Sequence, residues 1–189
     1  MERGRCLGSR RNDARPGDGR QLSPQRGFDD GQGSCLGRRR KRGTRQQAFG
    51  RSRGGFTCKV HCLSDAKGLP LVFHLTPGEA ADCTAFQDVI ALADARPKHL
   101  IADKGYDTDA IRAALREEGI ACCIPPKSTR KADIRWNKRI YRERNQIERM
   151  IGHLKINRAI ATRYDKLARS FLDVLHLATI RKCLRYATL

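Results

Sequence analysis

The sequence lacks long hydrophobic runs, since no window of its 189 residues approaches 18 uninterrupted apolar residues. A membrane-spanning helix needs about 20 such residues, so an integral helical membrane protein is excluded. The segment after Met1 is charged and glycine-rich and has no apolar central region, so no secretory signal is visible. We therefore expect a cytoplasmic protein.

Cysteine is present, but it lacks the usual metal-binding spacing. The eight cysteines include no CxxC pair, and a cytoplasmic location favours free thiols over disulfides. Cys58, His61 and Cys62 lie closest together. On a strand the two cysteines share one face and His61 points to the other, which argues against a zinc site.

Acidic residues are scarce relative to basic ones. Asp and Glu total 20 against 39 Lys and Arg, which gives a formal net charge of +19. This balance favours a polyanionic partner, most simply nucleic acid. It argues against an enzyme that acts on cationic substrates.

Apolar residues are sparse before residue 55, and the composition changes there. Residues 1–55 hold 12 of the 17 glycines and carry 15 Lys and Arg against 5 Asp and Glu. Such a stretch buries too little apolar surface to offset the entropy of ordering it, which predicts a disordered or loosely draped segment. Its densest charge, at residues 38–42, is interpreted either as a phosphate-binding arm or as a solvated tail without a selected role.

Hydrophobic periodicity in residues 56–189 predicts a folded domain of the α/β or α+β class. Residues 56–63 and 69–75 are typical of a β-hairpin, and residues 84–95 have apolar residues at helical spacing. An apolar run at 99–102, a helix that Asp107 or Thr108 can cap and Gly119 can end, and a run at 121–124 predict a parallel strand–helix–strand unit. Two further helices are expected at about 138–160 and 167–187. The expected fold is a mixed sheet flanked by helices.

Asp103 ends the apolar run at 99–102, and open α/β sheets bind ligands at the carboxyl ends of parallel strands. A carboxylate there can bind Mg²⁺ or act as a general base, or it can be a turn residue that bonds its own backbone. On the helix expected at 138–160, one narrow stripe contains Tyr141, Arg144, Glu148 and Lys155. The apolar stripe of the same helix lies directly beside it.

Glu148 therefore lies at the edge of the buried face, where it could meet Asp103 at the strand end. Two converging carboxylates would make a hard-oxygen site for Mg²⁺ or Mn²⁺, and the neighbouring Arg144 and Lys155 could bind phosphates. The alternative is a solvated ion pair between Arg144 and Glu148, which spacing alone favours.

Five stretches of the chain resemble, in order, the C-terminal catalytic part of bacterial insertion-sequence transposases of the DDE type. Four of them are residues 50–56 (GRSRGGF), 75–82 (LTPGEAAD), 101–107 (IADKGYD) and 161–171 (ATRYDKLARSF). The most specific is Tyr141-x2-Arg144-x3-Glu148-x6-Lys155, which has the Y-R-E-K spacing of the family. The resemblance covers residues 43–189.

The resemblance implies an RNase H-like fold in which Asp103 is the second acidic residue of a metal-binding triad and Glu148 the third. It implies that Tyr141, Arg144 and Lys155 contact transposon-end DNA. The implied reaction is phosphodiester cleavage and strand transfer, with Mg²⁺ or Mn²⁺ as the cofactor.

The resemblance also implies partners and a location. We expect Arg51 and Arg53, in the first matching stretch, to bind DNA as well. The partners would be transposon-end and target DNA, together with further transposase subunits, either identical copies or full-length chains. The implied location is the bacterial cytoplasm, in association with the nucleoid.

The sequence lacks the first acidic residue of the family's triad. In the family that Asp lies on the first, usually central, strand, an apolar strand that carries Asp-Ser/Ala-Thr. The acidic residues nearest to that place, Asp29 and Asp30, lie in a Gly/Arg-rich segment without a strand pattern. We therefore expect the first strand to be missing and cleavage to be impaired, with DNA binding surviving better than cleavage.

These departures predict two parts in the chain. Residues 1–50 would be a disordered Gly/Arg-rich segment that can derive from another reading frame, and residues 51–189 a DDE transposase catalytic domain. Two alternatives to an active transposase stay open. One is a non-catalytic DNA-binding transposase fragment, and the other is a generic basic RNA-binding protein, which would leave the Y-R-E-K stripe unexplained.

Overall fold

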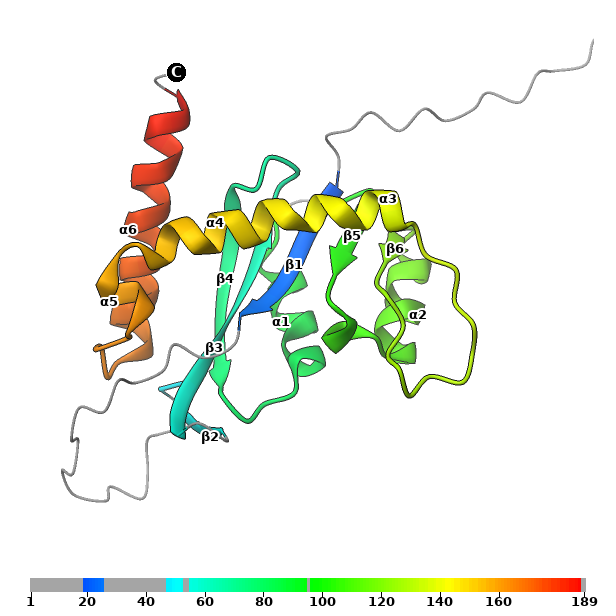
Figure 1. Ribbon diagram of the computed structural model, residues 1–189, viewed down its shortest axis with the longest axis horizontal. Coiled ribbons are helices and arrows are strands. Elements are labelled where there is room, and N and C mark those ends of the chain that lie inside the picture. The colour runs from blue at the N-terminus through cyan, green and yellow to red at the C-terminus, as the bar shows by residue number, and fades with distance from the viewer. Residues whose placement is uncertain (1–18, 26–46, 53–54, 95, 188–189) are drawn as a thin grey trace, which may run out of the picture.

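A mixed β-sheet forms the centre of the computed structural model, which describes residues 19–25, 47–52, 55–94 and 96–187 (Figure 1). Within these residues the strands are β1 (Gly19–Gln25), β2 (Gly50–Ser52), β3 (Gly55–Ser64), β4 (Pro70–Pro77), β5 (His99–Ala102) and β6 (Ala121–Cys123). β3 pairs antiparallel with β4, with β1 and, at its start, with β2. β1 pairs in parallel with β5, and β5 in parallel with β6. β1 therefore joins an antiparallel half of the sheet to a parallel half.

Helices and 3₁₀ turns connect these strands and follow them. They are η1 (Asp82–Ala85), α1 (Phe86–Ala91), η2 (Lys104–Tyr106), α2 (Asp109–Glu117), α3 (Lys138–Tyr141), η3 (Arg142–Arg144), α4 (Asn145–Lys155), α5 (Arg158–Ala161) and α6 (Ala168–Ala187). Thr108 Oγ1 accepts a hydrogen bond from Ile111 N at 3.2 Å, so Thr108 and not Asp107 caps α2. Gly119 follows α2 at φ 70°, a left-handed conformation that glycine adopts without steric cost.

Alternating side chains of the strands fill one core on each face of the sheet. On one face α1 and α2 cover a core that includes Leu63 of β3. On the other face α4, α5 and α6 cover a core that includes Cys58 and Cys62 of the same strand. His61 lies on the first face, where it bonds Tyr106. The two cysteines and His61 thus point to opposite faces, as strand geometry predicts, and do not form a zinc site.

The expectation of a missing first strand is not confirmed, because a strand, β1, occupies the centre of the sheet. Leu22 lies opposite Leu63 of β3 on one side and opposite Ala102 of β5 on the other. Its side chain is fully buried in the core beneath α1 and α2. The expectation rested on a missing apolar alternation. Main-chain pairing does not require that alternation, because almost every residue carries a backbone donor and acceptor.

The segment at 1–50 that composition predicts to be disordered is described only in part. Gly19–Gln25 form β1, and residues 47–50 lead into β2 and form its first position, so the prediction of disorder is wrong for these residues. The basic run at 38–42 and the two acidic residues Asp29 and Asp30 lie outside the described residues.

The hairpin and the C-terminal helices follow the sequence predictions closely. β3 and β4 form the expected hairpin, and Asp65 Oδ1 in its turn accepts hydrogen bonds from Lys67 N at 2.9 Å and Leu69 N at 2.7 Å. The helix expected at 138–160 is divided by η3, and its main part ends at Lys155. In the described part of the chain, no helix combines the length and apolar character needed to cross a bilayer.

Candidate active site

Asp103 follows β5 directly, at the end of the parallel half of the sheet. Its main-chain oxygen accepts a hydrogen bond from Tyr106 N at 2.9 Å, which forms the turn η2. Its side chain is 25% exposed, so the carboxylate is partly buried but reaches the surface. The sequence predicts this location at the carboxyl end of a parallel strand, where such sheets place ligands.

Tyr141, Arg144 and Glu148 reach Asp103 from the helical run α3–α4, which crosses the sheet in Figure 1. The Tyr141 hydroxyl donates a hydrogen bond to Asp103 Oδ1 at 3.2 Å, and Arg144 Nη1 lies 2.9 Å from the same oxygen. Arg144 also pairs with Glu148 Oε1 through Nη2. One guanidinium therefore joins the carboxylate at the strand end to the carboxylate on the helix.

Helical spacing explains why these groups meet. The buried residues of α4 pack in the core beside β3, and they are Ile147, Met150, Ile151 and Leu154. Glu148 follows Ile147 at the margin of this apolar face and is half exposed. The sequence left an ion pair between Arg144 and Glu148 as the alternative, and this pair does form. The Arg144 guanidinium also binds Asp103, however.

The electrostatic environment of Asp103 favours a nearby cation. Burial raises the pKa of Asp103 above its ordinary value, while the charge of Arg144 and the hydrogen bond from Tyr141 oppose this rise. Glu148 and Asp82 add negative charge nearby and raise the pKa further. Arg144 also lies over the Tyr141 ring, with Cζ 5.6 Å from the ring centroid. A positive group beside Asp103 is therefore stabilised from several sides.

The carboxylates of Asp103 and Glu148 are the kind of ligand that a hard divalent cation prefers, but there are only two of them. Oxygens of Asp103 and Glu148 both bind the Arg144 guanidinium, so two carboxylates already converge on one positive group. Carboxylate oxygens are ligands that Mg²⁺ and Mn²⁺ prefer. Among the described residues, however, no group of three His, Cys, Asp or Glu side chains could hold a metal ion. The cluster is one carboxylate short of a triad.

The other residues expected to bind DNA are Lys155, Arg51 and Arg53. Lys155 is half-buried at the end of α4, about two helical turns beyond Glu148. Arg51 is exposed on β2, and Arg53 lies outside the described residues.

The structure adds Trp136, which the sequence analysis did not single out. Its ring meets the Tyr141 ring edge to face, with centroids 5.0 Å apart. Trp136 lies five positions before the first residue of the Y-R-E-K stripe, and it is the only tryptophan of the chain. That proximity in sequence was the available signal.

Next to the Asp103 turn lies a buried polar set that periodicity did not reveal. The fully buried His61 ring bonds the Tyr106 hydroxyl through Nδ1 at 2.7 Å and Thr76 Oγ1 through Nε2 at 2.8 Å. Burial lowers the pKa of His61 to about 4, so the ring is neutral at pH 7. It ties the turn η2 to the β3–β4 hairpin.

We predict that acidification destabilises the fold through His61. Because its pKa is depressed in the folded state, the unfolded chain binds this proton more readily, and stability falls as the pH drops from about 6.5 to about 4. The expected loss is about 3 kcal/mol of unfolding free energy. Urea unfolding of wild type and His61→Gln at pH 7, 5.5 and 4.5 measures it, because the other histidines are common to both. Equal pH dependence in the two proteins would contradict the prediction.

Comparisons with known proteins identify the family of the chain. The sequence model of the family described as "Transposase DDE domain" matches residues 30–181. A Brucella ovis protein named as a transposase for insertion sequence element IS6501 is 36% identical, over 65% of this chain and 94% of its own length. A Burkholderia cepacia protein named as a transposase for insertion sequence element IS402 is 33% identical, over 66% of this chain and 64% of its own length. The chain therefore belongs to the family of insertion-sequence transposases with a DDE domain.

Proposed function

We propose that the chain binds transposon DNA as the catalytic part of an insertion-sequence transposase and that its cleavage activity is impaired. The observation that carries the proposal is the Arg144 guanidinium that joins Asp103 to Glu148 beside Tyr141. Three residues of the Y-R-E-K spacing thereby meet the carboxylate at the end of β5. An isolated helical ion pair, or a generic basic RNA-binding surface, gives no reason for Asp103 to take part.

The same proposal includes an RNase H-like fold. Its support is the central first strand, with an antiparallel hairpin on one side and two parallel strands on the other. Helices cover both faces of this sheet. The resemblance implies a fold with a central first strand, and the second acid of the triad, Asp103, follows the strand that pairs with it.

Each residue of the cluster has a role in this proposal. Asp103 and Glu148 would hold Mg²⁺ or Mn²⁺, and the Tyr141 hydroxyl orients the Asp103 carboxylate. Arg144 neutralises the two carboxylates and, when another cation replaces it there, can turn its fork of donors to a DNA phosphate. A divalent ion bound there would polarise the phosphodiester and activate the attacking oxygen.

Exposed basic side chains beside the cluster supply a surface for the DNA backbone. On α3, η3 and α4 they are Lys138, Arg139, Arg142 and Arg149. Such side chains bind phosphates without reading sequence, and their contribution falls as salt rises. This part of the function does not depend on the number of carboxylates.

The central strand favours impaired cleavage. β1 has the sequence GRQLSPQ and contains no acidic residue. It also precedes the range 30–181 that matches the family, so the strand in the first position comes from outside the matched part. Two carboxylates hold one divalent ion weakly and a second hardly at all, and a two-metal reaction should then lose most of its rate. This observation also favours the second candidate, a non-catalytic DNA-binding transposase.

We expect the wild-type chain to bind duplex DNA and to nick supercoiled plasmid with Mg²⁺ only near background. Replacing Arg144 with glutamine should weaken binding about 10-fold, because a charged donor beside the DNA path is lost. Arg116→Gln removes the same charge from an exposed position of α2, outside this basic surface, and is the matched control. Fluorescence anisotropy with a labelled duplex measures both affinities. Equal losses of DNA affinity in the two variants would show that Arg144 contributes only nonspecific charge. Robust nicking that Asp103→Ala abolishes would contradict the proposed impairment of cleavage.

A further inference from the structure

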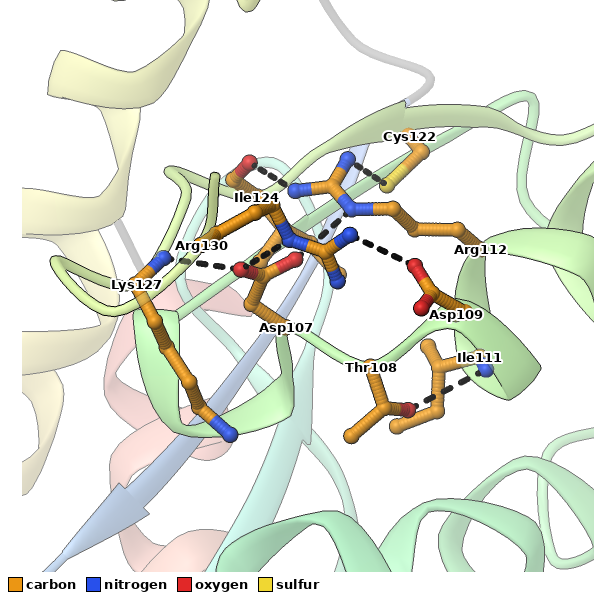
Figure 2. Close-up of polar contacts among 9 residues, drawn as sticks. All are labelled: Asp107, Thr108, Asp109, Ile111, Arg112, Cys122, Ile124, Lys127 and Arg130. Atoms are coloured by element: carbon orange, nitrogen blue, oxygen red, sulfur yellow. Dashed lines mark hydrogen bonds and ion pairs between the residues drawn. The ribbon is translucent and has the colours of Figure 1, made fainter. Parts of the chain in front are cut away.

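Asp107, four residues after Asp103, is a fully buried carboxylate held by two arginines from different segments (Figure 2). Arg112 of α2 donates through Nε to Oδ1 at 2.8 Å, and Arg130 donates through Nε to Oδ2 at 2.9 Å. The main-chain N–H of Lys127 also donates to Oδ2, at 2.7 Å. A buried carboxylate with this many charged and main-chain donors is a rigid junction, because removing any donor leaves charge poorly solvated.

The two arginines hold different parts of the chain. Arg112 reaches across to β6 and its end, where it donates to the Ile124 carbonyl at 2.8 Å and to Cys122 Sγ at 3.6 Å. Arg130 belongs to the segment at 124–137, between β6 and α3, which contains no helix or strand. Its second contact, from Nη1 to Asp109 Oδ1 at 2.5 Å, fixes it to the start of α2. Arg112 thus links α2 to β6 and the residue that follows it, whereas Arg130 fastens the 124–137 segment to Asp107 and to the start of α2.

The 124–137 segment leads directly to the candidate active site. At its far end Cys123 Sγ donates to the Asn137 carbonyl at 3.3 Å, and Asn137 Oδ1 caps α3 by accepting from Arg139 N and Ile140 N. Trp136 packs edge to face on Tyr141, whose hydroxyl donates to Asp103. The segment is therefore fastened at Asp107 near its start and beside Tyr141 at its end.

We propose that Asp107 is a positioning residue: by holding Arg130 it fixes the 124–137 segment and thereby sets Tyr141 and Arg144 in place beside Asp103. This inference rests on the proposed function, since it concerns the placement of residues that would bind DNA. Arg130 would act through this junction and not by touching phosphate, because Asp107 and Asp109 engage its Nε and Nη1.

Arg130→Gln is the decisive variant. Asp107→Asn would disturb the buried junction itself and could prevent folding, whereas Arg130→Gln leaves the Arg112 contacts to Asp107, Cys122 and Ile124 intact. Lys131→Gln removes the same charge from the next, exposed position and is the matched control. Arg130→Lys tests rescue, because an ammonium group can restore one bond to Asp107.

The readout is the fluorescence of Trp136, the only tryptophan of the chain. In Arg130→Gln the acrylamide quenching constant should rise roughly twofold as the segment loosens. Duplex binding should weaken about 5-fold, because residues that act together lose their alignment. Lys131→Gln should leave quenching unchanged, and Arg130→Lys should fall between wild type and Arg130→Gln. Circular dichroism confirms that each variant is folded.

The outcomes separate this inference from the proposed function. Quenching that is the same in wild type and Arg130→Gln, or that rises equally in Lys131→Gln, overturns the positioning role. A wild-type chain that binds no duplex DNA overturns the proposed function, while the comparison of quenching still decides whether Arg130 fastens the segment. Higher quenching in Arg130→Gln with unchanged DNA affinity also overturns the inference, since it shows that the segment does not set the binding residues.

Discussion

Replacing Ser23 with aspartate should raise Mg²⁺-dependent nicking of supercoiled plasmid on the order of 100-fold above the wild-type chain. The reason is the register of the two central parallel strands. Leu22 of β1 lies opposite Ala102, the last residue of β5, so Ser23 is the next residue of β1 and Asp103 is the residue that directly follows β5. Paired strands lie roughly 4.8 Å apart, so positions 23 and 103 are neighbours along the backbone of the two strands. An aspartate at position 23 would, with Asp103 and Glu148, complete a set of three acids.

Three control variants make this prediction specific. Ser23→Asn has nearly the same shape without the charge and should stay at background. Gln21→Asp places the same charge two positions earlier, opposite Ile101, and should also stay at background. Adding Asp103→Asn to Ser23→Asp should abolish the gain, because the new acid acts only with its neighbour. Nicking that survives this double substitution, or no gain from Ser23→Asp in a folded protein, would contradict the placement of the site.

Local periodicity predicted the elements after residue 55 because their apolar side chains face the two cores at regular spacing. The same reasoning placed Glu148 beside the buried stripe of its helix, and the structure brings it to the guanidinium that also binds Asp103. β1 could not be predicted in this way. Its order comes from main-chain pairing with β3 and β5 and from the buried Leu22, and one apolar residue leaves no pattern in the sequence.

Side-chain networks were the other feature that the sequence could not predict. The sequence offered Asp107 only as a possible cap for the helix that follows it, because nothing local identifies its partners at positions 112, 127 and 130 as spatial neighbours. Arg163 is a stronger case. Its hydrogen-bond partners at positions 47 and 48 lie 116 and 115 residues away in sequence. Such contacts arise only when the whole chain has folded, so in the sequence Arg163 looks like an ordinary surface arginine.

Replacing Arg163 with methionine should lower the free energy of unfolding by about 3 kcal/mol. Arg163 is 1% exposed, and its guanidinium donates to the carbonyls of Gln47 at 2.8 Å, Ala48 at 3.4 Å and Asp165 at 3.3 Å. Its Cζ also lies 3.8 Å from the centroid of the Phe49 ring. Methionine fills similar volume but leaves carbonyls without donors, each of which costs about 1–3 kcal/mol when buried.

One effect opposes this loss. Replacing a buried charge with an apolar side chain removes its desolvation cost, and some buried ion pairs can be replaced without loss of stability. In those cases both partners are replaced, whereas here the carbonyls of Gln47 and Ala48 stay in place. Ala48 also has φ 52°, a left-handed conformation that residues other than glycine seldom adopt and that the contact with Arg163 helps to hold. We therefore expect the loss of hydrogen bonds to dominate.

Urea unfolding of wild type, Arg163→Met and Arg163→Lys decides between these effects. Lysine keeps the charge but can bond fewer of the carbonyls, so its loss of stability should be the smaller one. Because Arg163 ties residues 47 and 48 to the α5–α6 junction, Arg163→Met should also speed amide exchange in β2, next to these residues, before the rest of the sheet. Unchanged stability in Arg163→Met would mean that desolvation of the guanidinium cancels its hydrogen bonds. Its role would then be to fix where β2 and Arg51 lie, and faster exchange in β2 would still report it.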